Sequence, residues 1–317
     1  MPHFGRIVTS TEEKITREGA KKSRLVKKGD LILSNSMSYG LPYIMGIDGY
    51  IHDGWFVLKD FEDTFDKDYL CNLLISSAIQ NQYKRLAAGG VVQNISSDLV
   101  NSVSVSIPLM EEQKKISSLL NLIDDRIATQ NKIIDNLQSL IRGIAQKIVC
   151  SNKSNVRLSE CVECSSSNLQ ESDVCEHGTY PVYGANGIVG YLDNYNTERE
   201  AVYIIKDGSG VGTVSYVTGK CSATGTLNTL QAKEGYSLQY LYYLLKVFSF
   251  EPYKTGMAIP HIYFKDYGKA KVFCPSYTEQ LQYARLLSAI DSKLSVEKNI
   301  LTNLSLQKQY LLHQMFI

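Results

Sequence analysis

The chain has 317 residues, of which 44% are hydrophobic and 21% charged, a composition that excludes a disordered protein and allows two domains with cores of their own. A formal net charge of +1 excludes a global attraction to nucleic acid, so any such binding must come from local patches or from a partner. No apolar run approaches the roughly 18 residues of a membrane span. The opening MPHFGRIVTS lacks the pattern of a secretory signal, and seven unevenly spaced cysteines favour reduced thiols in a cytoplasm.

The first block, residues 1–108, reads as a mixed α/β domain. Its opening stretch, residues 14–30, is rich in Lys and Arg and holds only Glu18 and Asp30 as acids. The predicted elements that follow are a strand at 31–34, a polar turn at 35–40, a strand pair at 43–51 with a hairpin signal at Asp48-Gly49, a helix at 68–86, a loop at 87–96 and a strand at 103–108. Pro108 ends the last strand and leads into a long helix.

A helix is predicted over residues 111–149, because apolar residues recur there at alternating spacings of four and three, as on the seam of a coiled coil. The seam positions are Ile116, Leu120, Ile123, Ile127, Gln130, Ile134, Leu137, Ile141, Ile144 and Ile148. At 1.5 Å per residue, a helix of roughly 40 residues is about 60 Å long, far beyond an ordinary globular helix.

The second block follows a polar linker at residues 151–156. Its predicted elements are a short helix at 158–164, strands with tight turns at 179–195, a strong strand at 201–206, a loop at 207–212, a returning strand at 213–217, a helix at 237–248, a loop at 255–267 and a closing strand at 270–275. Residues 276–317 then form a second long helix. The predicted domains are therefore 1–108, 109–150, 151–275 and 276–317.

The second long helix repeats the first at a constant offset without a gap. Residue pairs shared by the two copies include Gln113 and Gln280, Leu119 and Leu286, Ile123 and Ile290, and Asn136 and Asn303. The blocks before the helices correspond as well, through Tyr69 and Tyr240, Ile95 and Ile262, Val105 and Val272, and Pro108 and Pro275. The chain is thus a doubled unit. The first copy has no counterpart of about residues 157–194, so we expect its domain to be shortened at its start.

This doubled pattern resembles the specificity subunit of type I restriction-modification systems. Each long helix is entered through a closing strand, a proline and a Glu-Gln pair, in IPLMEEQKKI at residues 107–116 and CPSYTEQLQY at residues 274–283. YPVYGANGIVGY at residues 180–191 and VYIIKDGSGVG at residues 202–212 resemble motifs of its target-recognition domains. The resemblance covers nearly the whole chain, and the shortened first domain departs from it.

The resemblance implies an α+β fold in which two mixed α/β target-recognition domains are separated by a long antiparallel two-helix coiled coil. It implies a non-catalytic protein in the cytoplasm of a bacterium or archaeon, which reads a bipartite target in double-stranded DNA. The expected partners are DNA methyltransferase subunits and a restriction and translocase subunit, with no membrane. Whether a second copy of the chain is also a partner stays open at this point. S-adenosylmethionine, ATP and Mg²⁺ would belong to the partner subunits, and no cofactor to this chain.

An antiparallel pairing of the helices would place Ile116 against Leu311 and Gln130 against Glu297. A polar pair in an apolar seam costs stability but fixes the register of two helices. We therefore expect Gln130 and Glu297 to set the register and, through it, the distance between two DNA half-sites. The alternative is a plain helix–helix contact with incidental polar residues.

For DNA binding, sequence readout needs donors and acceptors near base edges and cations near phosphates. Loops between the predicted strands, together with nearby cations, supply both. The candidates are Lys21, Lys22, Arg24, Asn35, Ser38, Tyr39, Lys84, Arg85 and Asn94 in the first domain, and Lys206, Ser209, Lys220, Thr224, Lys254, His261 and Lys265 in the second. The alternative for each is a solvated surface residue, and the tyrosines are better read as packing residues.

Other chemistry finds little support. The glycines of residues 208–212 lie between two strands without the context of a nucleotide motif, so we expect a turn. Cys161, Cys164, Cys175 and His177 have a spacing that could hold zinc, but two thiols on one face of a short helix are better explained as packing residues. No methyltransferase motif, P-loop or nuclease carboxylate cluster is present, so we expect neither a catalytic nor a metal site.

Two other functions stay open at this point. The chain could be a coiled-coil module whose globular blocks bind protein and not DNA. It could also be a silent or regulatory form of a specificity subunit, able to bind the methyltransferase but impaired in reading DNA by its shortened first domain.

Overall fold

The structure, a computed structural model, describes residues 6–35, 40–87, 95–256 and 258–316. The chain folds into two compact units. Unit 1 comprises Met1–Ile134 and Val296–Ile317, and unit 2 comprises Asp135–Ser295. Both long helices, α5 at Met110–Cys150 and α9 at Tyr277–Met315, contribute to both units.

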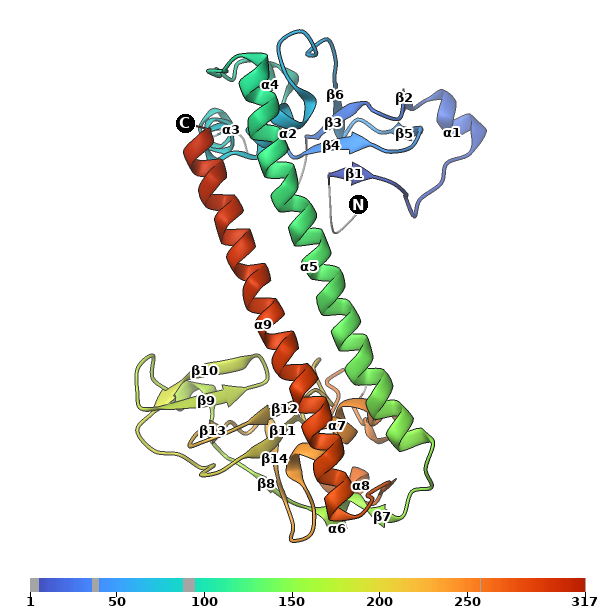
Figure 1. Ribbon diagram of the computed structural model, residues 1–317, viewed down its shortest axis with the longest axis vertical. Coiled ribbons are helices and arrows are strands. Elements are labelled where there is room, and N and C mark those ends of the chain that lie inside the picture. Colours follow the sequence, from blue (N-terminus) through green and yellow to red (C-terminus); the bar gives the residue numbers. More distant parts are fainter. Residues whose placement is uncertain (1–5, 36–39, 88–94, 257, 317) are drawn as a thin grey trace. The chain divides into compact units, whose positions relative to one another are not determined.

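The two long helices occupy the ranges that the heptad pattern predicts. Within unit 1, the first part of α5 and the last part of α9 lie side by side in opposite directions (Figure 1). Their facing sides bury Leu120, Ile123 and Leu304. Within unit 2, Ile148 near the end of α5 packs in one cluster with Ala284 near the start of α9. The antiparallel pairing is therefore present in both units.

Unit 1 is built on a four-stranded sheet with the order β1-β4-β3-β6. Its elements are β1 Ile7–Val8, α1 Arg17–Lys21, β2 Arg24–Val26, β3 Leu31–Ser34, β4 Pro42–Met45, β5 Gly49–Ile51, β6 Trp55–Leu58, α2 Lys67–Ile75, α3 Ser77–Ala87 and α4 Ser97–Asn101. All four residues of the central strand β3 are buried. Leu31 and Leu33 of this strand pack against α2 and α3.

Three predictions for unit 1 are wrong. β4 and β5 do not form a hairpin, because β5 pairs with β2, and Asp48 accepts a hydrogen bond from the main-chain N–H of Lys28 at 2.8 Å. The single helix predicted at 68–86 is two helices, since Ser76 between α2 and α3 is extended. Within the described part of the chain, residues 103–108 form no strand.

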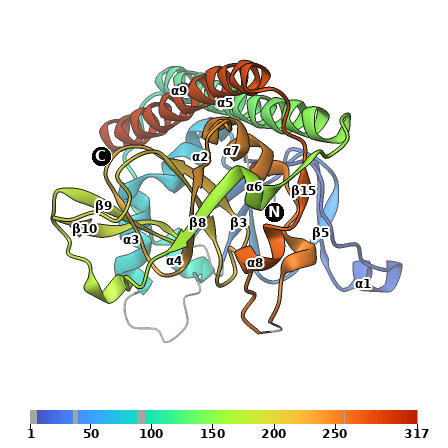
Figure 2. The same ribbon diagram turned by 90° about the horizontal axis from the view of Figure 1, so that it is seen from below.

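Unit 2 contains a larger sheet, β12-β11-β14-β8, and a smaller one, β10-β9-β13. Its elements are β7 Val156–Arg157, α6 Leu158–Cys161, β8 Val162–Ser166, η1 Glu171–Asp173, β9 Tyr180–Gly184, β10 Gly187–Leu192, β11 Ala201–Ile205, β12 Val214–Val217, β13 Ser222–Ala223, β14 Leu227–Ala232, α7 Leu238–Val247, η2 Glu251–Tyr253, α8 Phe264–Tyr267 and β15 Lys271–Val272. Helix α7 packs on the larger sheet (Figure 2). The helix predicted at 158–164 ends at Cys161, because Cys164 already pairs with Leu230 in the sheet.

The repeat in the sequence is also a repeat in the fold. In unit 1, β3 pairs with β4 and β6, and in unit 2, β11 pairs with β12 and β14, each time in antiparallel fashion. Helices α2 and α7 follow these sheets at equivalent places in the chain. The predicted α+β fold, with two mixed α/β units and an antiparallel pair of long helices, is confirmed.

A buried glutamine ties each long helix to its unit. The Gln113 side chain accepts a hydrogen bond from the Asp66 N–H at 2.9 Å and donates to the Pro108 carbonyl at 3.0 Å. Gln280 repeats both contacts, with the Ser237 N–H and the Pro275 carbonyl, each at 2.9 Å. Asp66 and Ser237 are the N-caps of α2 and α7, so each glutamine fixes a helix start against the entry of a long helix.

A charged cluster further joins the elements of unit 1. Asp124 on α5 accepts hydrogen bonds from Arg6 at 3.2 Å and from Lys308 on α9. Arg6 also donates to the buried Asn72 on α2, at 2.5 Å. Burial lowers the pKa of the Lys308 ammonium, and the hydrogen bond to Asp124 partly offsets this decrease. The cluster thus depends on one carboxylate facing two cations.

Candidate nucleic-acid interface

Two loops of unit 2 are joined at the end of strand β11. Loop A comprises residues 206–213, and loop B comprises residues 254–263, of which the structure describes all but residue 257. The Ile262 N–H donates to the Lys206 carbonyl, and the Gly208 N–H donates to the Pro260 carbonyl, both at 3.0 Å. Nδ1 of His261 lies 2.6 Å from Oδ1 of Asp207. Loop A and loop B therefore form one connected surface.

This surface gathers most of the candidates in unit 2. Ser209 and Lys265 are exposed, while Lys206, Lys254 and His261 are half-buried. The Lys265 ammonium lies 5.2 Å from the centre of the Tyr263 ring, and Lys254 pairs with a nearby carboxylate at 2.5 Å. Hydroxyl, imidazole and ammonium groups thus lie around two joined loops, the kinds of group that contact base edges and phosphates.

The two other candidates of unit 2 lie elsewhere. Lys220 is exposed, with its ammonium 4.6 Å from the centre of the Tyr195 ring. Thr224 is buried, and its hydroxyl is 2.8 Å from that of Thr226. Its N–H donates to the Tyr183 carbonyl, which places it between the two sheets. Thr224 is therefore not available to a base edge. It was predicted to lie in an exposed loop, but it is buried where the two sheets pack together.

The glycines of loop A form the turn predicted for residues 208–212. Gly208 and Gly212 have φ angles of 94° and 89°, which other residues adopt only with strain. A Cβ at Gly212 would also lie 3.0 Å from Phe250. The turn returns the chain from β11 to β12 and so positions Lys206 and Ser209.

Unit 1 repeats this geometry at Asn35, the residue after β3. The Asn35 carbonyl accepts a hydrogen bond from the Ile95 N–H at 2.8 Å, as the Lys206 carbonyl does from Ile262. The Asn35 N–H donates to Gly54 at 3.1 Å, as the Lys206 N–H does to Thr226 at 3.0 Å. Ser38, Tyr39 and Asn94, predicted for the same surface, lie outside the described residues.

The remaining candidates of unit 1 are exposed cations. Lys21 ends α1, Lys22 caps it, and Arg24 lies on β2. Lys84 and Arg85 lie in the last turn of α3. All five are exposed, so the positive charge of residues 14–30 faces solvent where it can attract phosphates.

The helix face that Cys161 and Cys164 were expected to share is not present, so this expectation is wrong. Cys161 ends α6 and Cys164 lies on β8. The Cys161 sulfur instead lies 3.7 Å from that of Cys274, and burial raises the pKa of Cys164 to about 11. Among the described residues, no group of three His, Cys, Asp or Glu side chains could hold a metal ion.

Three residues escaped the sequence reasoning. Asp207 holds His261, and Gln113 and Gln280 tie the long helices to their units. The aligned Glu-Gln pairs were the available signal for the glutamines, but nothing in the sequence indicates that Asp207 and His261 meet.

None of the described helices combines the length and the apolar character of a membrane span.

Comparison with known proteins identifies the architecture. The model of the type I restriction modification DNA specificity domain matches residues 4–139 and 151–306. A Mycoplasma genitalium protein named as a type I specificity subunit is 26% identical over 265 residues, covering 75% of this chain and 68% of its own length. The EcoprrI specificity subunit of Escherichia coli is 26% identical over 113 residues, which are 36% of this chain and 28% of that protein. The chain thus aligns with less than a third of that relative.

Solved structures share the fold. A crystal structure of the type I restriction-modification S subunit from M. genitalium has a TM-score of 0.64 at 19% identity, over 94% of this chain and 85% of that one. A chain from a structural study of complex assembly and conformational transition of the type I restriction-modification system has a TM-score of 0.59 at 16% identity, over 91% and 82%. Because the family model covers both halves of the repeat, the chain belongs to the family of type I restriction-modification DNA specificity domains, as the resemblance in its sequence predicts.

Proposed function

We propose that the chain is the DNA-recognition subunit of a type I restriction-modification complex, and that it reads a bipartite target in double-stranded DNA. One domain within residues 1–108 reads one half of the target, and one domain within residues 151–275 reads the other. The observation that carries this proposal is the repeated geometry at Asn35 and Lys206, where the same two hydrogen bonds hold equivalent strand ends. Two equivalent backbone frames, each holding its own loops, are what the recognition of a target in two halves requires.

In this proposal the side chains of loop A and loop B contact base edges, and the cations contact phosphates. Ser209 and His261 offer hydroxyl and imidazole groups to bases, and Lys206 and Lys265 offer charge to the backbone. In unit 1, the exposed cations around α1 supply the charge. Since phosphate contacts release counterions, affinity should fall steeply with salt.

We further propose that the long helices dock the methyltransferase subunits, which supply the S-adenosylmethionine chemistry while this chain remains non-catalytic. Equivalent apolar side chains are exposed on both helices. Leu119 and Leu286 are 42% and 50% exposed, and Ile133 and Ile300 are each 37% exposed. Exposed apolar residues at matching positions are typical of a surface that a partner covers. The restriction subunit, with ATP and Mg²⁺, would join the same assembly.

Gln130 of α5 and Glu297 of α9 are in contact within unit 1. Nε2 of Gln130 donates to the Glu297 main-chain carbonyl at 3.1 Å and to its carboxylate. Both residues are buried in an otherwise apolar seam. We propose that this pair fixes the register of the helices.

The proposal is tested by co-purification and by DNA binding. The chain is expressed with a type I methyltransferase subunit, and the complex is titrated onto a pool of random duplexes. Charge reversals Lys206→Glu and Lys265→Glu should weaken binding at least tenfold, and the exposed Lys271→Glu on β15 is the matched control. Binding that neither selects a sequence nor responds to the loop variants would contradict DNA reading. Failure to co-purify would contradict docking.

A further inference from the structure

The backbone of His261 is held from two sides. Its main-chain N–H donates to the Thr255 carbonyl at 2.7 Å, and its carbonyl accepts from the Thr255 N–H at 2.9 Å. Across loop A, His261 forms an antiparallel bridge with Asp207. The next residue, Ile262, is 1% exposed and anchors loop B in the core of unit 2. The chain segment that carries the imidazole is therefore fixed in place.

The Asp207 carboxylate also fixes the imidazole ring. Nδ1 of His261 lies 2.6 Å from Oδ1 of Asp207, and each side chain is 36% exposed. An ionised carboxylate only accepts hydrogen bonds, so the proton of this bond belongs to Nδ1. In a neutral ring with its proton on Nδ1, Nε2 carries a lone pair and accepts.

Nε2 of His261 is open to a ligand. Among the described residues it has no hydrogen-bond partner, and it is not one of the buried side-chain atoms that lack a partner. This atom is therefore accessible from outside the unit. A Cβ at Gly256 would lie 3.2 Å from Cδ2 of His261, the ring atom bonded to Nε2, so a glycine keeps this side of the ring uncovered.

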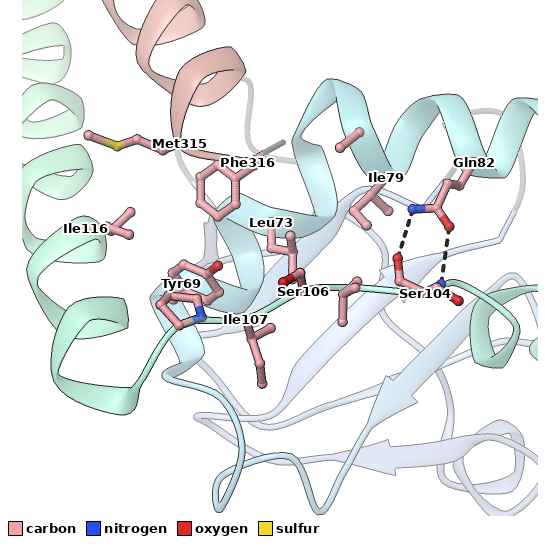
Figure 3. A pocket seen from close by; sticks show the side chains of 13 residues that line it. Tyr69, Leu73, Ile79, Gln82, Ser104, Ser106, Ile107, Ile116, Met315 and Phe316 are labelled. Atoms are coloured by element: carbon pink, nitrogen blue, oxygen red, sulfur yellow. Dashed lines mark hydrogen bonds between the residues drawn. The ribbon is translucent and has the colours of Figure 1, made fainter.

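The main cavity of unit 1 has a different character. Its volume is about 400 Å³, and no charged side chain is among the described residues that line it (Figure 3). The amide of Gln82 in its wall bonds with the main chain of Ser104 on both sides, at 2.9 and 3.2 Å. This cavity offers apolar contacts, whereas His261 offers one unpaired polar atom to a polar partner.

Asp207 is an unexpected residue on a surface that contacts DNA. It is the single acid in the sequences of loop A and loop B, which otherwise carry Lys206, Lys254 and His261. A carboxylate repels phosphates and so weakens the attraction that the cations provide. The contact with His261 gives this costly group a purpose, because it sets which ring nitrogen carries the proton.

We infer that Asp207 is a positioning residue for base readout, which holds His261 so that Nε2 accepts a hydrogen bond from the exocyclic amino group of adenine or cytosine. The inference rests on the proposed DNA recognition and specifies its chemistry. In the major groove, adenine N6 and cytosine N4 are donors, whereas guanine and thymine present acceptors. His261 therefore selects adenine or cytosine at one position of the contacted strand, in the half of the target read within residues 151–275.

The first test measures the base preference at that position. The full chain in complex with a type I methyltransferase subunit selects duplexes from a random pool at about pH 8, and His261→Ala identifies the position by abolishing its preference. The unsubstituted complex should favour adenine or cytosine there by about tenfold. Asp207→Asn should remove this preference, because an amide also donates to Nδ1 and so allows a proton on Nε2.

Three further variants separate positioning from a structural role. Asp207→Glu keeps a carboxylate and should retain the preference. His261→Arg supplies donors only and should shift the selected base to guanine. Glu234→Gln is the matched control, because it removes one negative charge from an exposed side chain between β14 and α7, and it should change nothing.

The ring tautomer provides a readout that needs no DNA. Nitrogen NMR of the histidine-labelled chain at about pH 8, with the His261 signals assigned through His261→Gln, should show a proton on Nδ1 and none on Nε2. Asp207→Asn should add a population with its proton on Nε2. This measurement stays informative if a variant binds DNA poorly.

The outcomes distinguish this inference from the proposed function. Selective binding with guanine or thymine at the His261 position, or with a preference that Asp207→Asn leaves unchanged, would overturn the inference and leave DNA recognition standing. Selective binding in which no position responds to His261→Ala, or a proton on Nε2 in the unsubstituted chain, would do the same. Binding that selects no sequence would overturn the proposed function, and the inference with it.

Discussion

Substitution of the buried pair in the helix seam offers a quantitative test of what holds unit 1 together. Gln130→Leu removes the amide that donates to the Glu297 carboxylate inside an apolar seam. A hydrogen bond to a charged group contributes about 1.5–3 kcal/mol, so we expect this variant to lose about 2 kcal/mol of unfolding free energy. Glu297→Leu also removes the buried charge, so its cost should be nearer 1 kcal/mol.

The double replacement should behave differently from the sum of the single ones. Two leucines pack in the seam as apolar residues, and replacing a buried polar pair in this way is often neutral or stabilising by about 1–4 kcal/mol. The double-mutant cycle should therefore show a coupling of at least about 2 kcal/mol. Urea unfolding followed by Trp55 emission measures it, because Trp55 and both substituted residues belong to unit 1.

The register claim has its own readout. In the native register, cysteines at positions 123 and 304 should crosslink, and a pair at 123 and 311 should not. In the double-leucine background, the second pair should crosslink as well, because a purely apolar heptad seam tolerates a shift of one heptad. Additive free energies, or a single register retained in the double-leucine background, would refute the role assigned to Gln130 and Glu297.

Four further predictions concern other residues. Gln113→Leu should lower the stability of unit 1 by about 1–3 kcal/mol, because it removes the hydrogen bonds of the Gln113 side chain with the Asp66 N–H and the Pro108 carbonyl, and Trp55 emission should detect it. Gln280→Leu should destabilise unit 2 by a similar amount and leave the Trp55 transition in place. Asp124→Asn should cost unit 1 about 2 kcal/mol, since two cations then face each other without the carboxylate; an unchanged urea midpoint would contradict the charged cluster. Burial raises the pKa of the Cys71 thiol from 9.0 to about 12, so a thiol reagent at pH 8.5 should label the exposed Cys150 and spare Cys71. Because the folded state favours the protonated thiol, the stability that Cys71 contributes should be full below pH 9 and lost as the pH rises toward 12.

The sequence predicted the features that depend on local periodicity. The alternating spacing of four and three along residues 111–149 is a local property, and it was sufficient to predict the first long helix. The second copy of this pattern predicted the second helix, and the antiparallel alignment of the two copies placed Gln130 opposite Glu297. The constant offset between the two copies likewise anticipated the equivalence of the two units. The strong strand at 201–206 and its return at 213–217 were also readable, because β-branched residues and a glycine turn are local signals.

What failed depended on partners distant in the sequence. Residues 103–108 alternate like a strand, but a strand requires a neighbour, and no described strand lies beside them. Cys164 continues a helical pattern yet pairs in a sheet with Leu230. Thr224 follows a short strand like a loop residue, but the packing of two sheets buries it. The contact of Asp207 with His261 joins loops more than fifty residues apart, beyond the reach of any spacing rule.

The central claim, that this chain selects the DNA sequence that a type I methyltransferase modifies, is tested most directly by mapping methylated bases in cells. Cells carrying the methyltransferase subunit with the chain should show one bipartite methylated motif, and deletion of the chain should abolish it. Lys206→Glu with Lys265→Glu should reduce its methylation, while Lys271→Glu should not. Methylation that persists without the chain, or that is the same with every variant, would contradict the account.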